Sequence, residues 1–169
     1  MKTLYLIRHA KSSWDDPDQE DFERPLNKRG KKDAPNMAKR LKEKRVTPDL
    51  MITSPATRAL DTGKEFAKIL AYHNDKIKTD KRLYHANEDQ ILTVIRELKD
   101  RDRDEEEVVL LFGHNPGLTE FANVLLNESI DNIPTCGIAK AHLNIDRWKD
   151  ASFGCGTLTS FDFPKSKKD

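Results

Sequence analysis

An arginine and a histidine stand side by side near the start of the chain, directly after a short apolar run. The run covers Thr3–Ile7, and Arg8 and His9 follow it. A guanidinium carries a permanent planar charge and can bind phosphate through two parallel hydrogen bonds. An imidazole can act as a nucleophile or carry a proton near neutral pH. Taken alone, the pair is more simply explained as a strand end with no further role.

Two later segments place the same residue types after the same kind of apolar run. The run Asp49–Thr53 is followed by SPATR (Ser54–Arg58), and the run Val108–Phe112 is followed by GHNPG (Gly113–Gly117). Each segment also has an ordinary explanation when it is considered alone. The arginine would then lie on a solvated helix face, and the histidine would be exposed in a turn or cap it.

The three apolar runs would bring these groups together if they form neighbouring parallel strands. In open α/β sheets, ligands bind beyond the carboxyl ends of the strands. A shared site explains all four groups better than chance placement at three strand ends. The sequence therefore predicts an anion pocket made of Arg8, His9, Arg58 and His114.

The SPATR segment also has the features of a helix start. Ser54 is a suitable N-cap and Pro55 suits the first helical position, which places Arg58 about one turn into the helix. The N-terminus of a helix exposes free amide donors and a partial positive charge, and both attract anions. The predicted helix would therefore reinforce an anion site near Arg58.

Other uses of these residue types fit the sequence less well. The usual spacings of histidine metal ligands are absent, and two nearby arginines would repel a cation, so no metal is expected. Gly63 and Lys64 lack the upstream glycine of a phosphate-binding P-loop and precede Glu65. The two cysteines, Cys136 and Cys155, form no metal or redox motif, and we expect reduced thiols.

Length and composition indicate a single charged globular domain. The chain has 169 residues, of which 36% are hydrophobic and 35% charged, with a net charge of +1. Without a long basic stripe, neither nucleic acid nor a membrane surface is an expected partner. The N-terminus lacks the apolar region of a signal peptide, and we expect a cytoplasmic protein. We predict one domain over residues 1–163 and a disordered tail over 164–169.

Helical patterns alternate with the apolar runs, and this alternation indicates the fold. Apolar residues recur at helical spacing over 56–70, 91–98 and 118–125, and an earlier helix over 34–41 is either kinked at Pro35 or begins near Ala34. Two late strands are expected at Ile138–Ile145 and Thr157–Phe163. The pattern predicts an α/β protein, a three-layer α/β/α sandwich with a mostly parallel central sheet. The pattern is compatible with one of the two late strands running antiparallel, at or near an edge of the sheet.

Several segments together resemble the histidine phosphatase superfamily. LIRHAKSSW (Leu6–Trp14) is similar to the Arg-His motif of that family, and more narrowly to SixA-type phosphohistidine phosphatases, where Ala-Lys-Ser replaces the Gly-Glu of phosphoglycerate mutases. DFERPLNKRG (Asp21–Gly30), Ser54–Arg58 and GHNPGL (Gly113–Leu118) match further blocks in the right order, and Gly156–Leu158 resembles the last strand. The resemblance covers nearly the whole chain and implies a phosphoglycerate mutase-like fold.

The resemblance also implies a chemical role for the predicted pocket. His9 would be the nucleophile and form a phosphohistidine intermediate, Arg8 and Arg58 would hold the phosphoryl oxygens, and His114 would complete the cage. The arginines and a charged imidazole would supply the positive charge, so that no metal or cofactor is needed. For attack, one ring nitrogen of His9 must be neutral and the other held by a hydrogen bond, which we expect to involve the backbone.

Two further residues enter the predicted site through the same resemblance. Lys11 and Ser12 belong to the Arg-His motif and are expected to contact the substrate. The implied partner is a phosphorylated protein, such as a histidine phosphotransfer domain, or a small phosphorylated substrate. The charged surface offers no obvious dimer patch, and we expect a monomer.

A proton donor for the leaving group is not evident. Family members that cleave phosphoesters usually place a glutamate after the third strand or in a nearby insertion, whereas Leu83–Asp89 is short here. The weak candidates are Asp15, Asp16, Asp18, Asp21, His85 and Glu88. Glu88 is better explained as a first-turn helix residue.

The lack of a strong acid bears on the substrate. An alkoxide leaving group gains a factor of about 10² to 10⁴ from proton donation. An imidazole leaves more readily because its conjugate acid has a pKa near 6.5. The leading hypothesis is therefore a phosphohistidine protein phosphatase. The alternatives are a small-molecule phosphomonoester phosphatase of the same family and a non-catalytic phosphate-binding module.

Overall fold

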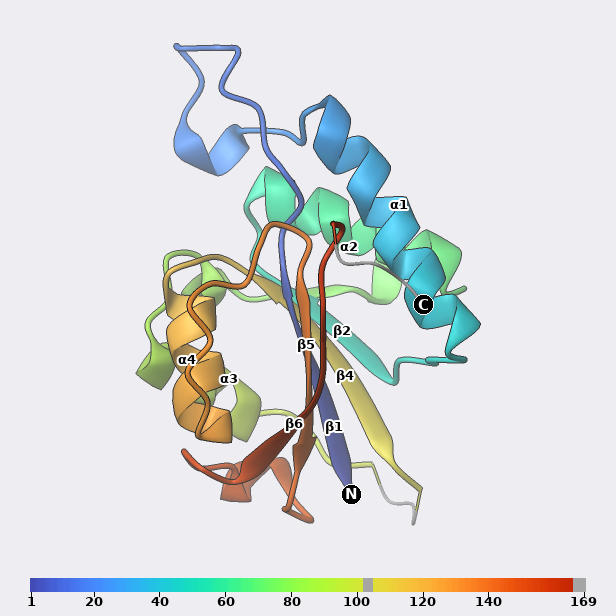
Figure 1. Cartoon of the computed structure of the whole chain (residues 1–169), viewed down its shortest axis with the longest axis vertical. Coiled ribbons are helices and arrows are strands. Elements are labelled where there is room, and N and C mark those ends of the chain that lie inside the picture. Colours follow the sequence, from blue (N-terminus) through green and yellow to red (C-terminus); the bar gives the residue numbers. More distant parts are fainter. Residues whose placement is uncertain (102–104, 166–169) are drawn as a thin grey trace.

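A six-stranded sheet forms the centre of the protein in a computed structural model that describes residues 1–101 and 105–165. Helices α1 and α2 cover one face of this sheet, and α3 and α4 cover the other (Figure 1). The strands are β1 (Lys2–Arg8), β2 (Leu50–Thr53), β3 (Lys78–Thr79), β4 (Glu107–Gly113), β5 (Ile138–Leu143) and β6 (Gly156–Asp162). The helices are α1 (Lys28–Glu43), α2 (Thr57–Ile69), α3 (Glu88–Arg96) and α4 (Gly117–Leu126). The predicted three-layer α/β/α fold is confirmed.

The strand order is β3-β2-β4-β1-β5-β6, and most neighbours are parallel. Strands β3, β2, β4 and β1 pair in parallel, whereas β5 is antiparallel to both β1 and β6. The expected antiparallel strand is therefore β5, next to the edge strand β6. The two-residue β3 was not predicted, because both of its residues are exposed and carry no apolar signal.

The register of the three central strands aligns their carboxyl ends. Arg8 of β1 pairs with Gly113 of β4, and Thr53 of β2 pairs with Phe112 of β4. The next residues continue this alignment, since the His9 N–H donates to the Gly113 carbonyl at 3.1 Å. The three motif segments consequently leave the sheet at the same rim.

Helix α1 begins earlier than predicted. Asn27 caps it by accepting a hydrogen bond from the Gly30 N–H at 2.9 Å, and the helix continues through Pro35 to Glu43. The prediction of a start near Ala34 is wrong. Proline removes one backbone donor, but the cap at Asn27 and the buried apolar face of the helix outweigh that loss.

Two glycines allow loops of the site to approach helix ends closely. A Cβ atom on Gly30 would lie 2.1 Å from the Lys11 carbonyl oxygen, and one on Gly117 would lie 1.8 Å from that of Ala86. Both distances exclude any side chain without a backbone shift. Gly117 therefore lets the segment that carries Tyr84 and His85 pack against the start of α4.

The remaining helices follow the predicted pattern with shifted ends. Helix α3 has an Asn87–Gln90 capping box and ends at Arg96, two residues before the predicted Leu98. Helix α4 begins at Gly117, one residue earlier than predicted. None of the helices in the described residues is long and apolar enough to cross a membrane. Of the predicted tail, Pro164 accepts a hydrogen bond from Arg40 at 3.1 Å, and residues 166–169 lie outside the described residues.

Candidate active site

The four residues predicted to form an anion pocket meet at the carboxyl ends of β1, β2 and β4. The ring centroids of His9 and His114 are 5.1 Å apart, and the rings are tilted by 51°. His9, Arg58 and His114 are buried, and Arg8 is half-buried. The predicted convergence is therefore present in the structure, while the roles of these residues stay predictions.

His9 is a neutral imidazole with one defined tautomer. Its Nδ1–H donates to the Ala10 carbonyl oxygen at 2.8 Å, which leaves a lone pair on Nε2. Burial lowers the pKa of His9 to about 4, and the positive charges of Arg58 and Arg8 add to this effect, although the bond to Ala10 opposes it. The backbone hydrogen bond expected from the sequence is present.

His114 is also neutral, which corrects the expectation of a charged imidazole. Burial lowers its pKa to about 2, with further contributions from His9 and Arg58. Its Nε2 lies 2.8 Å from the Ser54 Oγ, which itself accepts the Ala56 N–H at 3.2 Å. The Ser54 hydroxyl can therefore donate to Nε2, and the ring proton of His114 then lies on Nδ1.

The position of Ser54 corrects the predicted start of α2. The helix begins at Thr57 with Ala56 as N-cap, and no side chain caps it. Ser54 is buried beside His114 instead, and Arg58 is the second residue of the helix rather than one turn inside it. Ser54 was predicted to be a helix cap from its immediate neighbours in sequence. Its hydroxyl instead contacts His114, which lies 60 positions away.

Three buried N–H groups of the site have no acceptor among the described residues. They are the Nε atoms of Arg8 and Arg58 and the Nδ1 of His114. Other nitrogens of the two arginines are engaged: Arg8 Nη1 donates to the Ile133 carbonyl at 3.0 Å, and Arg58 Nη1 donates to the Asp21 carbonyl at 2.7 Å. Buried donors are rarely left unpaired in proteins, so the site is suited to an acceptor with several oxygens.

Asp21 lies against Arg58 and is the candidate acid that the structure brings to the site. Its Oδ2 accepts from the Tyr84 hydroxyl at 2.6 Å and from Arg58 Nη2 at 3.1 Å, and its Oδ1 accepts from Arg24 Nε at 3.1 Å. Partial burial raises the pKa of Asp21, but the bonds from Tyr84 and Arg58 outweigh it and lower the pKa to about 2. Asp21 is therefore ionised at neutral pH and has no proton to donate.

His85 lies at the rim of the site. Its Nε2 is 3.6 Å from Asp21 Oδ2, and its ring centroid is 4.0 Å from that of Tyr84 and 6.2 Å from that of His114. Its backbone has a φ of 55°, a left-handed value that is uncommon outside glycine.

The other candidate acids lie outside the four-residue pocket. Asp15, Asp16 and Asp18 are exposed in the loop after β1, and Asp16 accepts the Asp18 N–H at 3.0 Å. Glu88 is in the first turn of α3, as predicted.

Lys11 and Ser12 follow the pocket residues Arg8 and His9 and differ in burial. Ser12 is buried and accepts from Arg24 Nη1 at 2.9 Å, and Arg24 in turn contacts Asp21. Lys11 is exposed, and its carbonyl accepts the Asn27 N–H at 3.0 Å. Their predicted contact with substrate stays a prediction.

Four residues of the site were not predicted: Ser54, Arg24, Tyr84 and Thr62. Thr62 Oγ1 accepts the Ala10 N–H at 3.0 Å and donates to the Arg58 carbonyl at 2.7 Å, which joins the segment after β1 to α2. Arg24 also stacks on Trp14, with 3.4 Å between its guanidinium carbon and the ring centroid. These residues lie within or next to segments discussed from the sequence, but their hydrogen-bond partners become apparent only in the folded structure.

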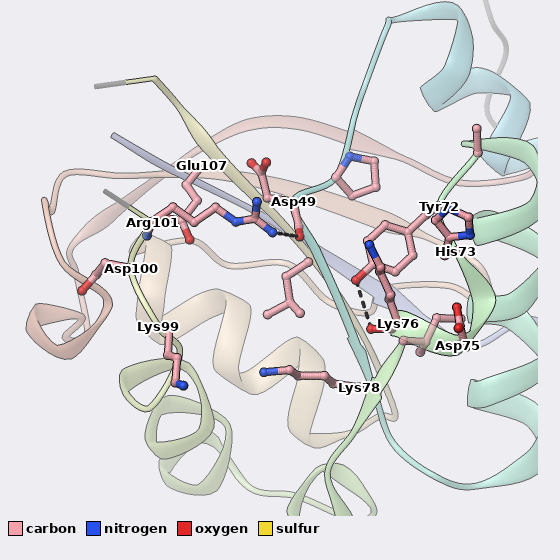
Figure 2. Close-up of a pocket in the computed structure, with 14 residues that line it drawn as sticks. Asp49, Tyr72, His73, Asp75, Lys76, Lys78, Lys99, Asp100, Arg101 and Glu107 are labelled. Carbon is pink, nitrogen blue, oxygen red and sulfur yellow. Dashed lines mark hydrogen bonds between the residues drawn. The ribbon is translucent and has the colours of Figure 1, made fainter. Parts of the chain in front are cut away.

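A separate hollow of about 700 Å³ lies at the opposite ends of the strands. Figure 2 shows its lining, which includes Leu50 and Glu107, the first residues of β2 and β4, together with Lys76, Lys78 and Lys99. This hollow is not lined by any of the four residues of the predicted anion pocket, Arg8, His9, Arg58 and His114. Within residues 1–101 and 105–165, no group of three or more His, Cys, Asp or Glu side chains is placed to hold a metal ion.

Comparisons with known proteins agree with the geometry. The family model of the histidine phosphatase superfamily (branch 1) matches residues 4–88. The chain is 31% identical to an uncharacterized protein, Rv1276c, of Mycobacterium tuberculosis over 171 residues, covering 94% of this chain and 100% of that protein.

Two solved structures share the fold over nearly the whole chain. A candidate phosphohistidine phosphatase, SixA from Agrobacterium tumefaciens, is 26% identical with a TM-score of 0.76, covering 96% of this chain and 97% of the other. A protein histidine phosphatase SixA complexed with tungstate is 22% identical with a TM-score of 0.81, at the same coverage.

Proposed function

Because this chain belongs to the histidine phosphatase superfamily and is a phosphatase, we propose that it hydrolyses phosphohistidine in proteins through a phosphoryl group carried on His9.

The neutral state of His9 supports its role as the nucleophile. Its Nε2 keeps a lone pair because Nδ1–H is bound to the Ala10 carbonyl. Attack by Nε2 on phosphorus forms an N–P bond, and the leaving group departs with the electron pair of the bond that breaks. Water then attacks the phosphorus, the electron pair of the new N–P bond returns to His9, and inorganic phosphate leaves.

The unpaired donors around His9 are the observation that carries the proposal. Arg8 Nε, Arg58 Nε and His114 Nδ1 are buried without an acceptor among the described residues, and a phosphoryl group offers three equatorial oxygens. Donors already in place at oxygens that gain charge in the transition state are usually the largest catalytic contribution. The SixA neighbour solved with tungstate, an oxyanion of similar shape, supports this assignment.

The state of Asp21 supports phosphohistidine as the substrate. A carboxyl with a pKa of about 2 cannot protonate a departing alkoxide at neutral pH. A phosphoramidate needs less help, because a neutral imidazole is a good leaving group. Exposed aromatic residues near the site, Trp14 and Phe22, fit contact with a protein surface, such as a histidine phosphotransfer domain.

A comparison of substrates tests the proposal. The kcat/KM values would be measured for a phosphohistidine peptide, a phosphoserine peptide, a sugar phosphate and an activated aryl phosphate. We expect the phosphohistidine peptide to exceed the phosphoserine peptide and the sugar phosphate clearly. Faster turnover of the sugar phosphate would assign a small-molecule phosphatase instead. Binding of tungstate without turnover of any substrate would contradict catalysis altogether.

A further inference from the structure

The Asp21 carboxylate is shared between two arginines and a tyrosine at the edge of the active site. It receives Arg58 and Tyr84 on one oxygen and Arg24 on the other. Its side chain is nevertheless 38% exposed. These contacts hold the carboxylate beside the phosphoryl-binding arginine while one side of it faces outward.

We propose that Asp21 determines specificity for phosphohistidine by accepting the ring N–H of the substrate and keeping that ring protonated. This role rests on the proposed function. It assigns to Asp21 the opposite task from that of a general acid, because Asp21 receives a hydrogen bond and gives up no proton.

The bonding capacity of the carboxylate leaves room for this contact. Each oxygen of an ionised carboxylate can accept about two hydrogen bonds. Oδ2 already accepts from Tyr84 and Arg58, and the Nε2 of His85 at 3.6 Å is too far for a third bond. Oδ1 accepts only from Arg24 among the described residues. One acceptor position of Oδ1 therefore remains for a donor outside the chain.

The location of Asp21 suits a leaving group. Its partner Arg58 carries one of the three unpaired donors, and its partner Tyr84 packs edge-on against His114 with 5.5 Å between centroids. A phosphoryl group bound by Arg58 would thus have its substituent close to Asp21. His85 packs against Tyr84 with 4.0 Å between ring centroids and a tilt of 37°, which places a second aromatic ring near Asp21.

The state of the substrate ring decides how well it leaves. When the N–P bond breaks, its electron pair stays on the ring nitrogen and the phosphoryl group moves to His9. If the other ring nitrogen carries a proton, the product is a neutral imidazole; without that proton, it is an imidazolate, which is a far poorer leaving group. A carboxylate that accepts the N–H favours the protonated ring. Asp21 would therefore keep the substrate reactive at higher pH.

A purely structural role of Asp21 makes a different prediction. If Asp21 only positioned Arg58, its loss would weaken phosphoryl transfer from every substrate by the same factor. The two roles therefore separate when turnover of phosphohistidine is compared with turnover of an aryl phosphate, whose phenolate leaves without a ring proton.

The experiment uses Asp21→Asn, Asp21→Glu and the wild-type protein, with Asp18→Asn as a matched control in the same loop. The kcat/KM values for a phosphohistidine peptide and an aryl phosphate are measured from about pH 6 to about pH 9, across the range in which imidazole titrates. Asp21→Asn should lower phosphohistidine turnover about tenfold to hundredfold more than aryl phosphate turnover, the usual effect of a hydrogen bond to a charged group. The decline of phosphohistidine turnover at alkaline pH should also move to lower pH.

The remaining variants and substrates complete the test. Asp21→Glu should restore part of the preference, and Asp18→Asn should leave both activities unchanged. Phosphorylated N-methylimidazole has no ring N–H, so Asp21→Asn should affect it no more than the aryl phosphate. Equal losses on all substrates with an unchanged pH profile would overturn the role of Asp21 alone. Turnover of aryl phosphate but not of phosphohistidine by the wild-type protein would overturn the proposed function as well.

Discussion

The Nε2 of His114 lies 2.8 Å from the hydroxyl oxygen of Ser54, and this contact joins the segments that follow β4 and β2. The Ser54 oxygen also accepts the Ala56 N–H, and its own proton can be donated to the histidine. When the hydroxyl donates to Nε2, the ring proton of His114 lies on Nδ1, the nitrogen that has no partner among the described residues.

Ser54→Ala should lower activity because His114 would no longer be restricted to one tautomer. We expect kcat/KM for an aryl phosphate to fall about tenfold and the free energy of unfolding to fall by about 1 to 3 kcal/mol, since two buried polar groups lose their partner. Steady-state kinetics and urea denaturation measure the two effects. Ser152→Ala, at an exposed serine, is the control, and unchanged kinetics in Ser54→Ala would contradict this account of His114.

His9→Ala should abolish turnover, because it removes the imidazole whose Nε2 we propose as the nucleophile, whereas the Nε2 of His114 is engaged by Ser54. Rapid quenching of the wild-type protein in alkali during turnover should trap a phosphoenzyme that is stable to alkali and labile to acid, and the variant should form none. The exposed His73, which lines the hollow of Figure 2, supplies the control His73→Ala. A phosphoenzyme that persists in His9→Ala would assign the nucleophile to another residue.

Arg58→Ala should remove one prearranged phosphoryl donor and part of the positive charge of the site. By analogy with the loss of an oxyanion donor, we expect kcat to fall by about 10² to 10³. Arg58→Lys should rescue little, because lysine supplies neither the Nε donor nor the planar geometry. Lys64→Ala, at an exposed position on the same helix, controls for the loss of a positive charge. Tungstate inhibition, measured in parallel, should weaken in both Arg58 variants and stay unchanged in the control.

Acidification should destabilise the protein at a pH where its carboxyl groups are still ionised. The pKa of His9 falls from 6.5 to about 4 on folding, and that of His114 from 6.5 to about 2. The unfolded chain therefore binds more protons than the folded chain once the pH falls below about 6.5. The stability that these histidines contribute is complete above that pH and is lost progressively as the pH falls towards 4.

Urea denaturation at several pH values measures this loss. Replacing both histidines with asparagine should flatten the dependence between about pH 6.5 and about pH 5, a window above the usual carboxyl pKa values. The same slope in the double variant would assign the proton uptake to other groups.

The positions of the predicted pocket residues followed from local signals. Each apolar run ended at the motif that it was expected to present, and the register of β1, β2 and β4 places Arg8 and Gly113 side by side. A buried parallel strand is readable from a continuous apolar run, because both of its faces are covered. Arg58 and His114 could therefore be brought together without knowledge of the rest of the fold.

The charge states and partners within the site could not be predicted in the same way. Ser54 was predicted to be a helix cap because the residues after it suit a helix start. Its hydroxyl instead contacts His114, which follows the neighbouring strand β4. Asp21 was one of six candidate acids, and the contacts of Arg58 and Tyr84, 37 and 63 positions later, show why its pKa is lowered. Burial and contacts distant in sequence decide both results.

The backbone of His9 is fastened on both sides, since its N–H bonds to Gly113 and its carbonyl accepts the Cys136 N–H at 3.0 Å. His9, the proposed nucleophile, is thus held by its backbone at the carboxyl rim of the sheet and cannot extend towards a target. A macromolecular substrate must therefore bring its phosphorylated side chain to His9. Because His9 is buried, we expect it to react with phosphorylated side chains that protrude from the surface of their protein and not with those that lie in a recess.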